Sequence, residues 1–318
     1  KEGSEATLDD IHRAIAELYG TKAYAAVNYR LLGRSPYDLE LTLRPRVANT
    51  LNVGFRFDSE VLAAILLNTT FRQGASRGGQ LSLTGRLSMN PYLRVEYSLE
   101  NTFLRRFNLA YTFQYNDVDV FSRGRKINNV TYRYHAGDLG ISNFYFRNFR
   151  FGVGLRYEFF DYNSLLFVNE GDVFDVRPEG FFSYYGTVQW ETVDRRFYPT
   201  RGVVLRADYS LYTDNFATYD GGPPFSALAW NFAPVVPVTN RFSLLPSLYG
   251  RVLIGGNTAY SYLNCMGGAE FGRYRSHQLP FAGISNVEIF DNALLVARLR
   301  LRQRMGSKHY LFLTGNYA

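Results

Sequence analysis

Apolar and polar residues alternate along about a dozen segments of this 318-residue chain. The segment 149–160 is an example, with apolar side chains at every second position: Phe151, Val153, Leu155, Tyr157 and Phe159. A side-chain period of two places the apolar and polar sets on opposite faces of a β-strand. Tilted strands of about ten residues cross the roughly 25–30 Å of hydrocarbon in a bilayer. The pattern therefore predicts an all-β membrane protein, an antiparallel transmembrane β-barrel.

About thirteen segments carry this pattern: 50–57, 61–72, 79–88, 92–102, 105–116, 138–146, 149–160, 181–192, 202–213, 225–236, 241–254, 292–304 and 308–317. The segment 126–135 also alternates, and is either another barrel strand or part of a hairpin standing above the membrane. The long connections are 117–137, 161–180, 214–224 and 255–291. If the beginning of the chain is periplasmic, the alternating direction of successive strands places all four long connections on the extracellular side, as barrels prefer.

Residues 1–48 follow a different pattern. Thr7 and Asp10 form a capping-box variant ahead of apolar residues at helical spacing, and Gly20 suits the end of that helix. Two strand candidates follow, 24–32 and 37–46, with a Gly-Arg-Ser-Pro turn between them. A helix and a hairpin are too small to bury a core alone. We interpret them as the tail of a small α/β module.

Composition agrees with the membrane interpretation. Phe (26 residues) and Tyr (25 residues) are abundant, as expected where aromatic girdles mark two membrane interfaces. The mean hydropathy of −0.20 reflects a polar lumen-facing half in each strand. A soluble β-sandwich also alternates, but its strands are usually shorter and interrupted by more Pro and Gly. The barrel is therefore the better hypothesis.

The net charge of +7 is spread along the strands. Because no helix or loop concentrates the Lys and Arg residues, we expect outer-membrane lipids and lipopolysaccharide as partners, and no nucleic acid. Cys265 is the single cysteine, so no intrachain disulfide can form. The four histidines have no metal-ligand spacing, and we expect no cofactor or metal.

Residues 194–202 read Asp-Arg-Arg-Phe-Tyr-Pro-Thr-Arg-Gly between two strong strands. This segment resembles the D-x-R-x-F-P-T-x-G signature of Omp85-superfamily barrels, through Asp194, Arg196, Phe197, Pro199 and Gly202. Pro199 and Gly202 favour a tight periplasmic turn, and Asp194 can form ion pairs with the neighbouring arginines at the barrel rim. The alternative is an ordinary strand connection.

A second segment resembles the long inward-folded loop of the same family. That loop carries Gly-Gly followed by an Arg-Gly-aromatic motif, and this chain has Gly267 and Gly268 followed by Arg273 and Tyr274. The resemblance implies that Arg273 docks in the lumen. Tyr274 stands where the family has glycine, which is a departure from the motif. The alternative is a solvated arginine in an extracellular loop.

The resemblance extends to the domain organisation. It implies a sixteen-stranded outer-membrane barrel in a Gram-negative bacterium, formed by residues 49–318 with C-terminal strands missing. It also implies that residues 1–48 are part of a periplasmic POTRA module. Within the superfamily, the segments Gly20–Tyr24, Val27–Tyr29 and Leu51–Arg72 are similar to the POTRA and barrel portion of bacterial patatin-like phospholipases of the type Vd autotransporter kind.

This likeness implies a translocator that anchors, and helps export, an N-terminal patatin-like lipid acyl hydrolase domain absent from this chain. The alternatives are an Omp85-type assembly or translocation factor and a passive anion-preferring pore. Partners would be the hydrolase domain itself, a second copy in a homodimer, or accessory outer-membrane subunits. We identify no catalytic residues in this chain and interpret Asp220-Gly221-Gly222 as a loop turn.

A stripe of arginines lies on one face of the segment 292–304: Arg298, Arg300, Arg302 and Arg304. Cations in line repel one another unless other groups compensate them. The stripe predicts either an anion-attracting lumen wall or ion pairs across the lumen with acidic residues such as Glu96, Glu100, Glu158, Asp208 and Glu270.

Overall fold

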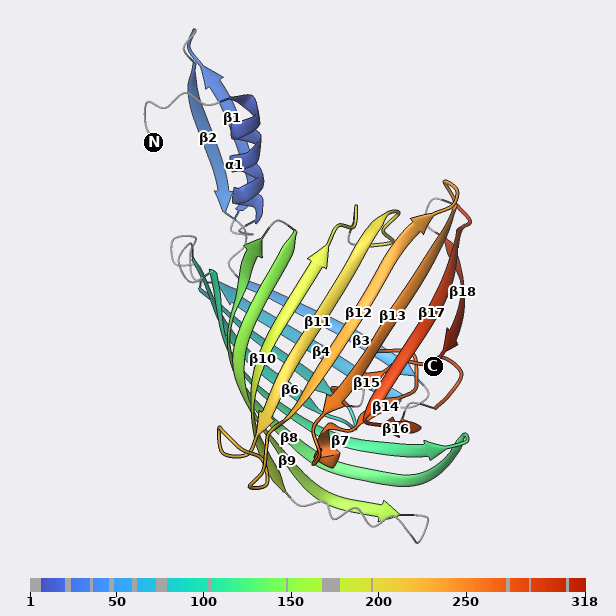
Figure 1. The fold of residues 1–318 in the computed structure, drawn as a ribbon. Helices are drawn as coiled ribbons and strands as arrows, with labels where there is room; N and C mark the ends of the chain where they lie inside the picture. The colour runs from blue at the N-terminus through green and yellow to red at the C-terminus, as the bar shows by residue number, and fades with distance from the viewer. Residues whose placement is uncertain are drawn as a thin grey trace.

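The fold is described here from a computed structural model. It describes residues 7–20, 24–34, 37–45, 49–58, 62–72, 79–101, 105–146, 148–167, 178–195, 197–272, 275–285, 287–306 and 309–318. One helix and a two-stranded hairpin stand beyond one end of a large curved sheet (Figure 1). We call the sheet end nearest this helix and hairpin the proximal end, and the opposite end the distal end.

The helix α1 (Leu8–Gly20) and the hairpin of β1 (Tyr24–Leu32) and β2 (Asp38–Pro45) confirm the expected elements. The Asp10 backbone N–H donates to Thr7 Oγ1 (3.3 Å), and the Thr7 N–H donates to Asp10 Oδ2 (3.1 Å). These reciprocal bonds satisfy donors that a helix start leaves unpaired. In the described part of the chain, no helix is both long enough and apolar enough to cross a membrane.

Thirteen antiparallel strands form the sheet, and each lies beside its neighbours in sequence except where a long loop intervenes between β13 and β17. The strands are β3 (Asn49–Asp58), β4 (Leu62–Arg72), β5 (Gly79–Leu87), β6 (Tyr92–Asn101), β7 (Arg105–Ser122), β8 (Arg125–Phe146), β9 (Phe149–Phe167), β10 (Glu179–Glu191), β11 (Gly202–Thr213), β12 (Phe225–Pro237), β13 (Phe242–Ile254), β17 (Ala293–Arg304) and β18 (Tyr310–Tyr317). Within the described residues the sheet is open, with β3 and β18 at its edges. The nearly all-β fold confirms the predicted class.

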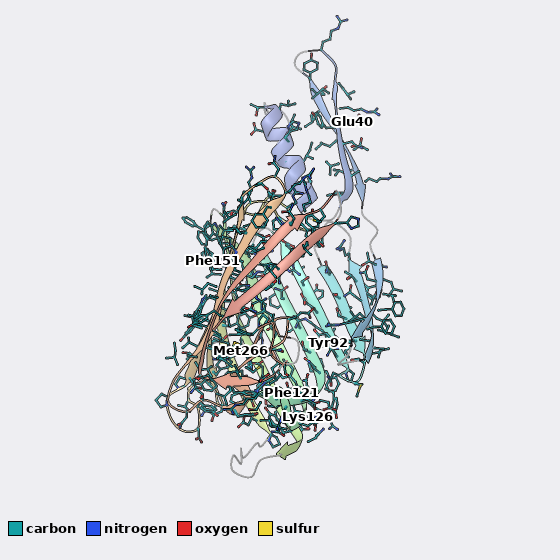
Figure 2. All side chains as sticks on the ribbon, turned by 90° about the vertical axis from the view of Figure 1, so that its right-hand side faces the viewer. Glu40, Tyr92, Phe121, Lys126, Phe151 and Met266 are labelled. Carbon is teal, nitrogen blue, oxygen red and sulfur yellow. The ribbon has the colours of Figure 1, made fainter. Side chains whose placement is uncertain are left out.

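The alternation seen in the sequence separates the two faces of this sheet. On β9, Val153 is 56% exposed on the outer face, whereas Glu158 on the inner face is 2% exposed. Figure 2 shows the labelled Phe151 on the outer surface and Met266 inside the curve of the sheet. The exposed apolar side chains belong to the face that a bilayer would cover.

Stacked aromatic rings lie near both ends of the outer face. At the proximal end, Phe149 stacks on Trp190 of the neighbouring strand, with ring centroids 5.7 Å apart. Toward the distal end, Phe182 stacks on Phe216 at 3.8 Å. This arrangement is typical of the two interfacial girdles of membrane barrels.

Strands β7, β8 and β9 run past the distal ends of their neighbours, and their extension corrects two predicted loops (Figure 1). Residues 117–137 are not a loop, because β7 and β8 form one continuous hairpin that turns at Arg123 and Gly124. The segment 126–135 is therefore the first half of β8. The predicted loop 161–180 is also too long, since β9 continues to Phe167.

The alternation inverts where this hairpin leaves the membrane zone. Up to Tyr115 the outer face of β7 is apolar, with Leu109 being 51% exposed. Beyond it, Asp117 and Asp119 face outward, and Val118 is 3% exposed on the inner face. Outside a bilayer the outer face meets water, and the inner face here packs on a loop, so the two faces exchange polarity.

That loop is residues 255–291, the long connection between β13 and β17. It contains the short helix η1 (Tyr260–Tyr262) and the strands β14 (Asn264–Met266), β15 (Gln278–Leu279) and β16 (Ile289–Asp291). The three strands form a small sheet in the order β15-β14-β16, inside the curve of the main sheet (Figure 1). The β7–β8 hairpin covers it, with the Phe121 N–H donating to the Val287 carbonyl at 2.8 Å.

Candidate functional site

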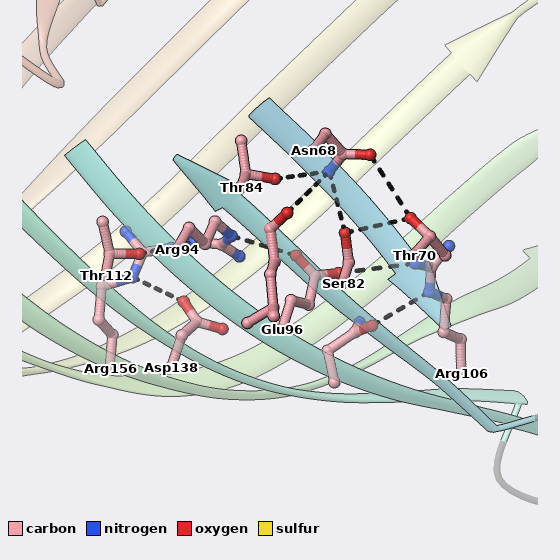
Figure 3. A network of polar contacts seen from close by, with 12 residues as sticks. Asn68, Thr70, Ser82, Thr84, Arg94, Glu96, Arg106, Thr112, Asp138 and Arg156 are labelled. Carbon is pink, nitrogen blue, oxygen red and sulfur yellow. Dashed lines mark hydrogen bonds and ion pairs between the residues drawn. The ribbon is translucent and has the colours of Figure 1, made fainter. Parts of the chain in front are cut away.

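The inner face of the sheet carries a continuous network of polar side chains (Figure 3). The Asn68 side-chain N–H₂ donates to Thr84 Oγ1 at 2.7 Å and to Ser82 Oγ at 3.2 Å. Further along, Glu96 pairs with Arg94 at 3.1 Å and with Arg106 at 3.6 Å. Each strand contributes at alternate positions, so the network follows from the same period that produces the outer apolar face.

The network continues onto β8 and β9. Arg156 Nε donates to Asp138 Oδ2 at 2.7 Å, and the Tyr185 hydroxyl donates to Asp138 Oδ1 at 2.9 Å. A Cβ on Gly154 would lie 2.3 Å from the Tyr185 hydroxyl oxygen, so the small inward-facing residues Gly140 and Gly154 leave room for this ring. This part of the wall is polar and extensively hydrogen-bonded, as in the aqueous interior of a barrel.

Tyr262 anchors the loop 255–291 to this wall. Its ring is fully buried and packs against Tyr212 (4.1 Å between centroids), Phe181 (4.9 Å) and Phe225 (5.6 Å). Its hydroxyl donates to Glu158 Oε2 at 2.7 Å, and Tyr134 donates to Glu158 Oε1 at 2.6 Å. The loop thereby satisfies a buried acidic side chain of the wall.

Arg251 on β13 holds the backbone of the same loop. Its Nη1 donates to the Tyr262 carbonyl at 2.7 Å and to the Asn264 side-chain oxygen. In return, the Asn264 side-chain N–H₂ donates to the Arg251 carbonyl at 3.0 Å and to the Asn292 carbonyl at 2.8 Å. Buried polar groups that satisfy one another in this way fix a single geometry.

The double glycine of the predicted loop motif lies within this docked loop. Gly267 and Gly268 have φ angles of 150° and 69°, which favour glycine, and the Gln278 side-chain N–H₂ donates to the Gly267 carbonyl at 2.9 Å. Arg273 and Tyr274, the other residues of the motif, lie outside the described residues. The docking role of Arg273 therefore stays a prediction.

Arg275 binds within the loop, although no motif or spacing in the sequence predicted this role. Its Nη2 donates to the carbonyls of Tyr260 (3.0 Å) and Ser261 (2.9 Å). Its guanidinium lies over the rings of Tyr260 (5.3 Å) and Phe290 (5.7 Å), within range of a cation–π interaction. Arg275 thus ties the returning half of the loop to η1.

The signature turn at residues 194–202 is organised around Asp194. Its Oδ1 accepts the Thr200 backbone N–H (2.7 Å), its Oδ2 accepts the Thr200 hydroxyl, and Arg195 Nε lies 3.5 Å from Oδ2. The hydrogen bond from the Thr200 hydroxyl is the main reason that the pKa of Asp194 lies well below its usual range. The predicted ion pair is present with Arg195, but threonine and backbone donors hold most of the turn. Arg196 lies outside the described residues.

Gly202 and Pro199 shape the same turn. Gly202 has a φ of 115°, and a Cβ there would lie 2.5 Å from the Thr192 carbonyl oxygen, so glycine is required. Arg302 on β17 donates to the Pro199 carbonyl at 2.6 Å. Tyr198 stacks on Tyr310 of β18, with centroids 4.4 Å apart. The turn therefore reaches past two strands, β12 and β13, to contact the β17–β18 hairpin, while Phe197 is 74% exposed.

The side chains of the arginine stripe make contacts of a similar kind. Arg298 donates to Asn316 Oδ1 (2.6 Å) and to the Pro280 carbonyl (2.9 Å), and Arg302 also donates to Ser243 Oγ (3.1 Å). Arg300 lies over the Phe312 ring at 5.8 Å, and the Arg304 backbone N–H donates to the Arg241 carbonyl oxygen.

Among the described residues, no ion pair joins the stripe to the acidic residues named for it. Glu96 pairs with its neighbours on β6 and β7, Glu158 binds tyrosines, and Glu270 lies 3.6 Å from Arg56. The stripe contacts carbonyl oxygens, polar side chains and aromatic rings instead, because the turn at residues 194–202 and the loop 255–291 pack against it.

Other candidate chemistry is limited. Asp220-Gly221-Gly222 forms a tight turn closed by Tyr219 and Gly222, which confirms the interpretation of this motif as a turn. Among the described residues, no group of three or more His, Cys, Asp or Glu side chains could hold a metal ion.

The fold and the docked loop together define a β-barrel of the outer-membrane type. A family model described as the OMP85 superfamily matches residues 37–318, and the chain belongs to this superfamily. It is thus an Omp85-type outer-membrane barrel, a family that occurs in Gram-negative bacteria. A comparison with curated protein sequences gave no match.

Solved structures share the fold at low sequence identity. BamA from Haemophilus ducreyi lacking POTRA domains 1–3 is 16% identical with a TM-score of 0.67, and the match covers 99% of this chain and 67% of that chain. CdiB from Escherichia coli is 15% identical (TM-score 0.64; 99% and 61%), and CdiB from Acinetobacter baumannii is 11% identical (0.59; 99% and 58%). The chain therefore spans about three fifths to two thirds of the lengths of these structures.

Proposed function

We propose that this chain is the membrane translocator of a larger protein and that it anchors and exports a patatin-like lipid acyl hydrolase domain of the same polypeptide. The docked loop is the observation that carries the translocator part. Tyr262, Arg251 and Arg275 hold residues 255–291 inside the curve of the sheet. A barrel whose interior holds an ordered loop is better suited to controlled passage than to free diffusion, which disfavours the passive anion-preferring pore.

Residues 1–48 would form part of a periplasmic POTRA module in this proposal. The capped helix α1 and the β1–β2 hairpin agree with the α/β character of such a module. The hydrolase assignment depends on the likeness of Gly20–Tyr24, Val27–Tyr29 and Leu51–Arg72 to patatin-like phospholipases. Catalysis would belong to the hydrolase domain, and outer-membrane lipids would be its immediate surroundings.

The alternative is an assembly or translocation factor that handles separate client proteins. The fold shared with BamA and CdiB favours it, although both likenesses are below 25% identity.

N-terminal peptide mapping of the protein purified from its source, by mass spectrometry, separates the two proposals. A G-x-S-x-G motif with a D-G-G or D-G-A partner upstream of Lys1, together with lipase activity lost on Ser→Ala substitution, is the expected result. Further POTRA modules without that motif would overturn the hydrolase assignment and favour the assembly factor.

A further inference from the structure

A cavity of about 130 Å³ lies between the loop 255–291 and the distal parts of β7, β8 and β9. The strands contribute the amides of Gln114 and Asn116 and the ring of Phe160. The loop contributes Arg275, Ser276 and His277. The cavity thus combines one permanent cation with amide groups, next to aromatic surface.

The cation in this cavity has no acidic partner in the described part of the chain. Within the described residues, both hydrogen bonds of Arg275 come from Nη2, and the N–H groups of Nε and Nη1 can bind a further acceptor. Burial disfavours the charged guanidinium, and the groups that interact with it electrostatically are the Cys265 thiol and tyrosine hydroxyls rather than a carboxylate. A partly buried guanidinium of this kind is expected to attract an anion.

The neighbouring side chains also present donors. Gln114 Nε2 donates to Asn116 Oδ1 at 2.5 Å, so the Asn116 oxygen is occupied and its N–H₂ remains a donor. Two tyrosine hydroxyls of the lining donate elsewhere, Tyr134 to Glu158 and Tyr162 to Ser261. The cavity is therefore rich in N–H donors, while the hydroxyl protons of these two tyrosines are already used.

His277 adds no charge to this arrangement. Its Nε2 donates to the Ser261 carbonyl at 2.8 Å, so Nδ1 accepts the Ser276 hydroxyl, also at 2.8 Å. Burial, helped by Arg251 and Arg275, holds the pKa of His277 well below its usual value. The imidazole is neutral near pH 7, and Arg275 is the charge that a ligand would meet.

We propose that this cavity binds a small free oxyanion of the phosphate class, held by Arg275 and the Asn116 amide. The planar guanidinium matches two oxygens of such an ion at once. A cavity of about 150 Å³ accommodates benzene, and phosphate has one heavy atom fewer, so the ion fits. A glycerol group on the phosphate would extend beyond a cavity of this volume. The bound ion would bridge the loop to β7, which is a property independent of the proposed hydrolase export.

Isothermal titration calorimetry of the full chain in detergent micelles tests the proposal, with inorganic phosphate titrated at constant ionic strength in chloride. Saturable phosphate binding is expected, and Arg275→Gln should weaken it at least about tenfold, since it removes a charge-assisted hydrogen bond. Arg300→Gln is the matched control, because it removes the same charge from an exposed arginine elsewhere on the inner wall. Glycerol 3-phosphate should bind at least about tenfold more weakly than phosphate, because of its size.

A second variant guards against a folding defect in Arg275→Gln. Asn116→Leu retains the side-chain size, removes the amide donor, and should also weaken phosphate binding, while heat-modifiable migration in gels reports an intact barrel. The proposal is overturned if wild type shows no saturable phosphate binding, if Arg275→Gln and Arg300→Gln bind equally well, or if glycerol 3-phosphate binds as tightly as phosphate. None of these results bears on the hydrolase assignment, because the purified chain is sufficient for the measurement.

Discussion

The Tyr262→Phe variant tests whether the loop 255–291 is held in the lumen by its hydrogen bond to the wall. Phenylalanine retains the ring contacts with Phe181, Tyr212 and Phe225 but removes the hydroxyl that donates to Glu158 at 2.7 Å. Glu158 is 2% exposed, so water cannot readily replace the lost donor. Loss of a hydrogen bond to a charged group costs about 1.5–3 kcal/mol, which shifts the release of the loop by roughly 10- to 150-fold.

Hydrogen–deuterium exchange with mass spectrometry, in detergent micelles, measures that release directly. Peptides from residues 255–291 should exchange roughly 10- to 150-fold faster in Tyr262→Phe, because protection reports the free energy of local opening. Tyr262→Ala should lose protection further, since truncation of a buried aromatic ring costs about 3–5 kcal/mol. The matched control is Tyr209→Phe, a tyrosine that is 46% exposed on the outer face. Unchanged protection in Tyr262→Phe would refute the assigned role of the hydroxyl.

Three further predictions concern the turn, the loop and the stripe. Gly202→Ala should lower the free energy of unfolding by about 3 kcal/mol in chemical denaturation, because of backbone strain and the clash with residues 192 and 193. Gly221→Ala is the control, since Gly221 also has a positive φ but lies in open space, and it should cost only about 1 kcal/mol. Equal effects of the two substitutions would contradict this reasoning. The pKa of His277 is below 6.5 in the folded chain and near 6.5 in a released loop, so docking of the loop should be constant above pH 6.5 and weaken as the pH falls below it. Hydrogen–deuterium exchange rates of the loop, corrected for the intrinsic pH dependence of exchange, measure this. His277→Gln should abolish the trend. Arg302→Gln should lower the free energy of unfolding by about 2 kcal/mol, because it removes the hydrogen bonds to the Pro199 carbonyl and to Ser243 Oγ. Arg300→Gln should be close to wild type in the same denaturation assay. A larger effect of Arg300→Gln than of Arg302→Gln would mean that the turn does not depend on the arginine stripe.

The strands were predictable because one physical rule governs them. Wherever the outer face meets hydrocarbon and the inner face meets polar groups, the period of two places each side chain, as in β9 and β10. The same rule explains the error at residues 117–137. The alternation continues there, but Asp117 and Val118 have exchanged the faces expected for a membrane strand, and the segment resembles a polar loop.

The docked loop could not be predicted in the same way. Its residues have no period, and its anchors join distant parts of the chain: Tyr262 and Glu158 are 104 residues apart in sequence. The turn at Asp194 was readable from its local residue types. Its stack on Tyr310 and the position of Arg275 depend on the curvature of the sheet, which no short segment encodes.

The exchange of faces on β7 also determines how deeply the molecule sits in the membrane. On the outer face of β7, Tyr115 is followed by Asp117 and Asp119, which accept hydrogen bonds from the Asn129 side chain at 2.6 and 2.7 Å. If β7 moved into the bilayer by two residues, about 6.6 Å along the strand, Asp117 would approach the hydrocarbon, where an acidic side chain costs up to about 2.5–3.5 kcal/mol. If β7 moved out of the bilayer by the same distance, Leu109 and the neighbouring apolar side chains would be exposed to water. The polar end of the hairpin therefore sets the depth of this barrel wall in the bilayer, and movement along the membrane normal costs more free energy than movement within the membrane plane.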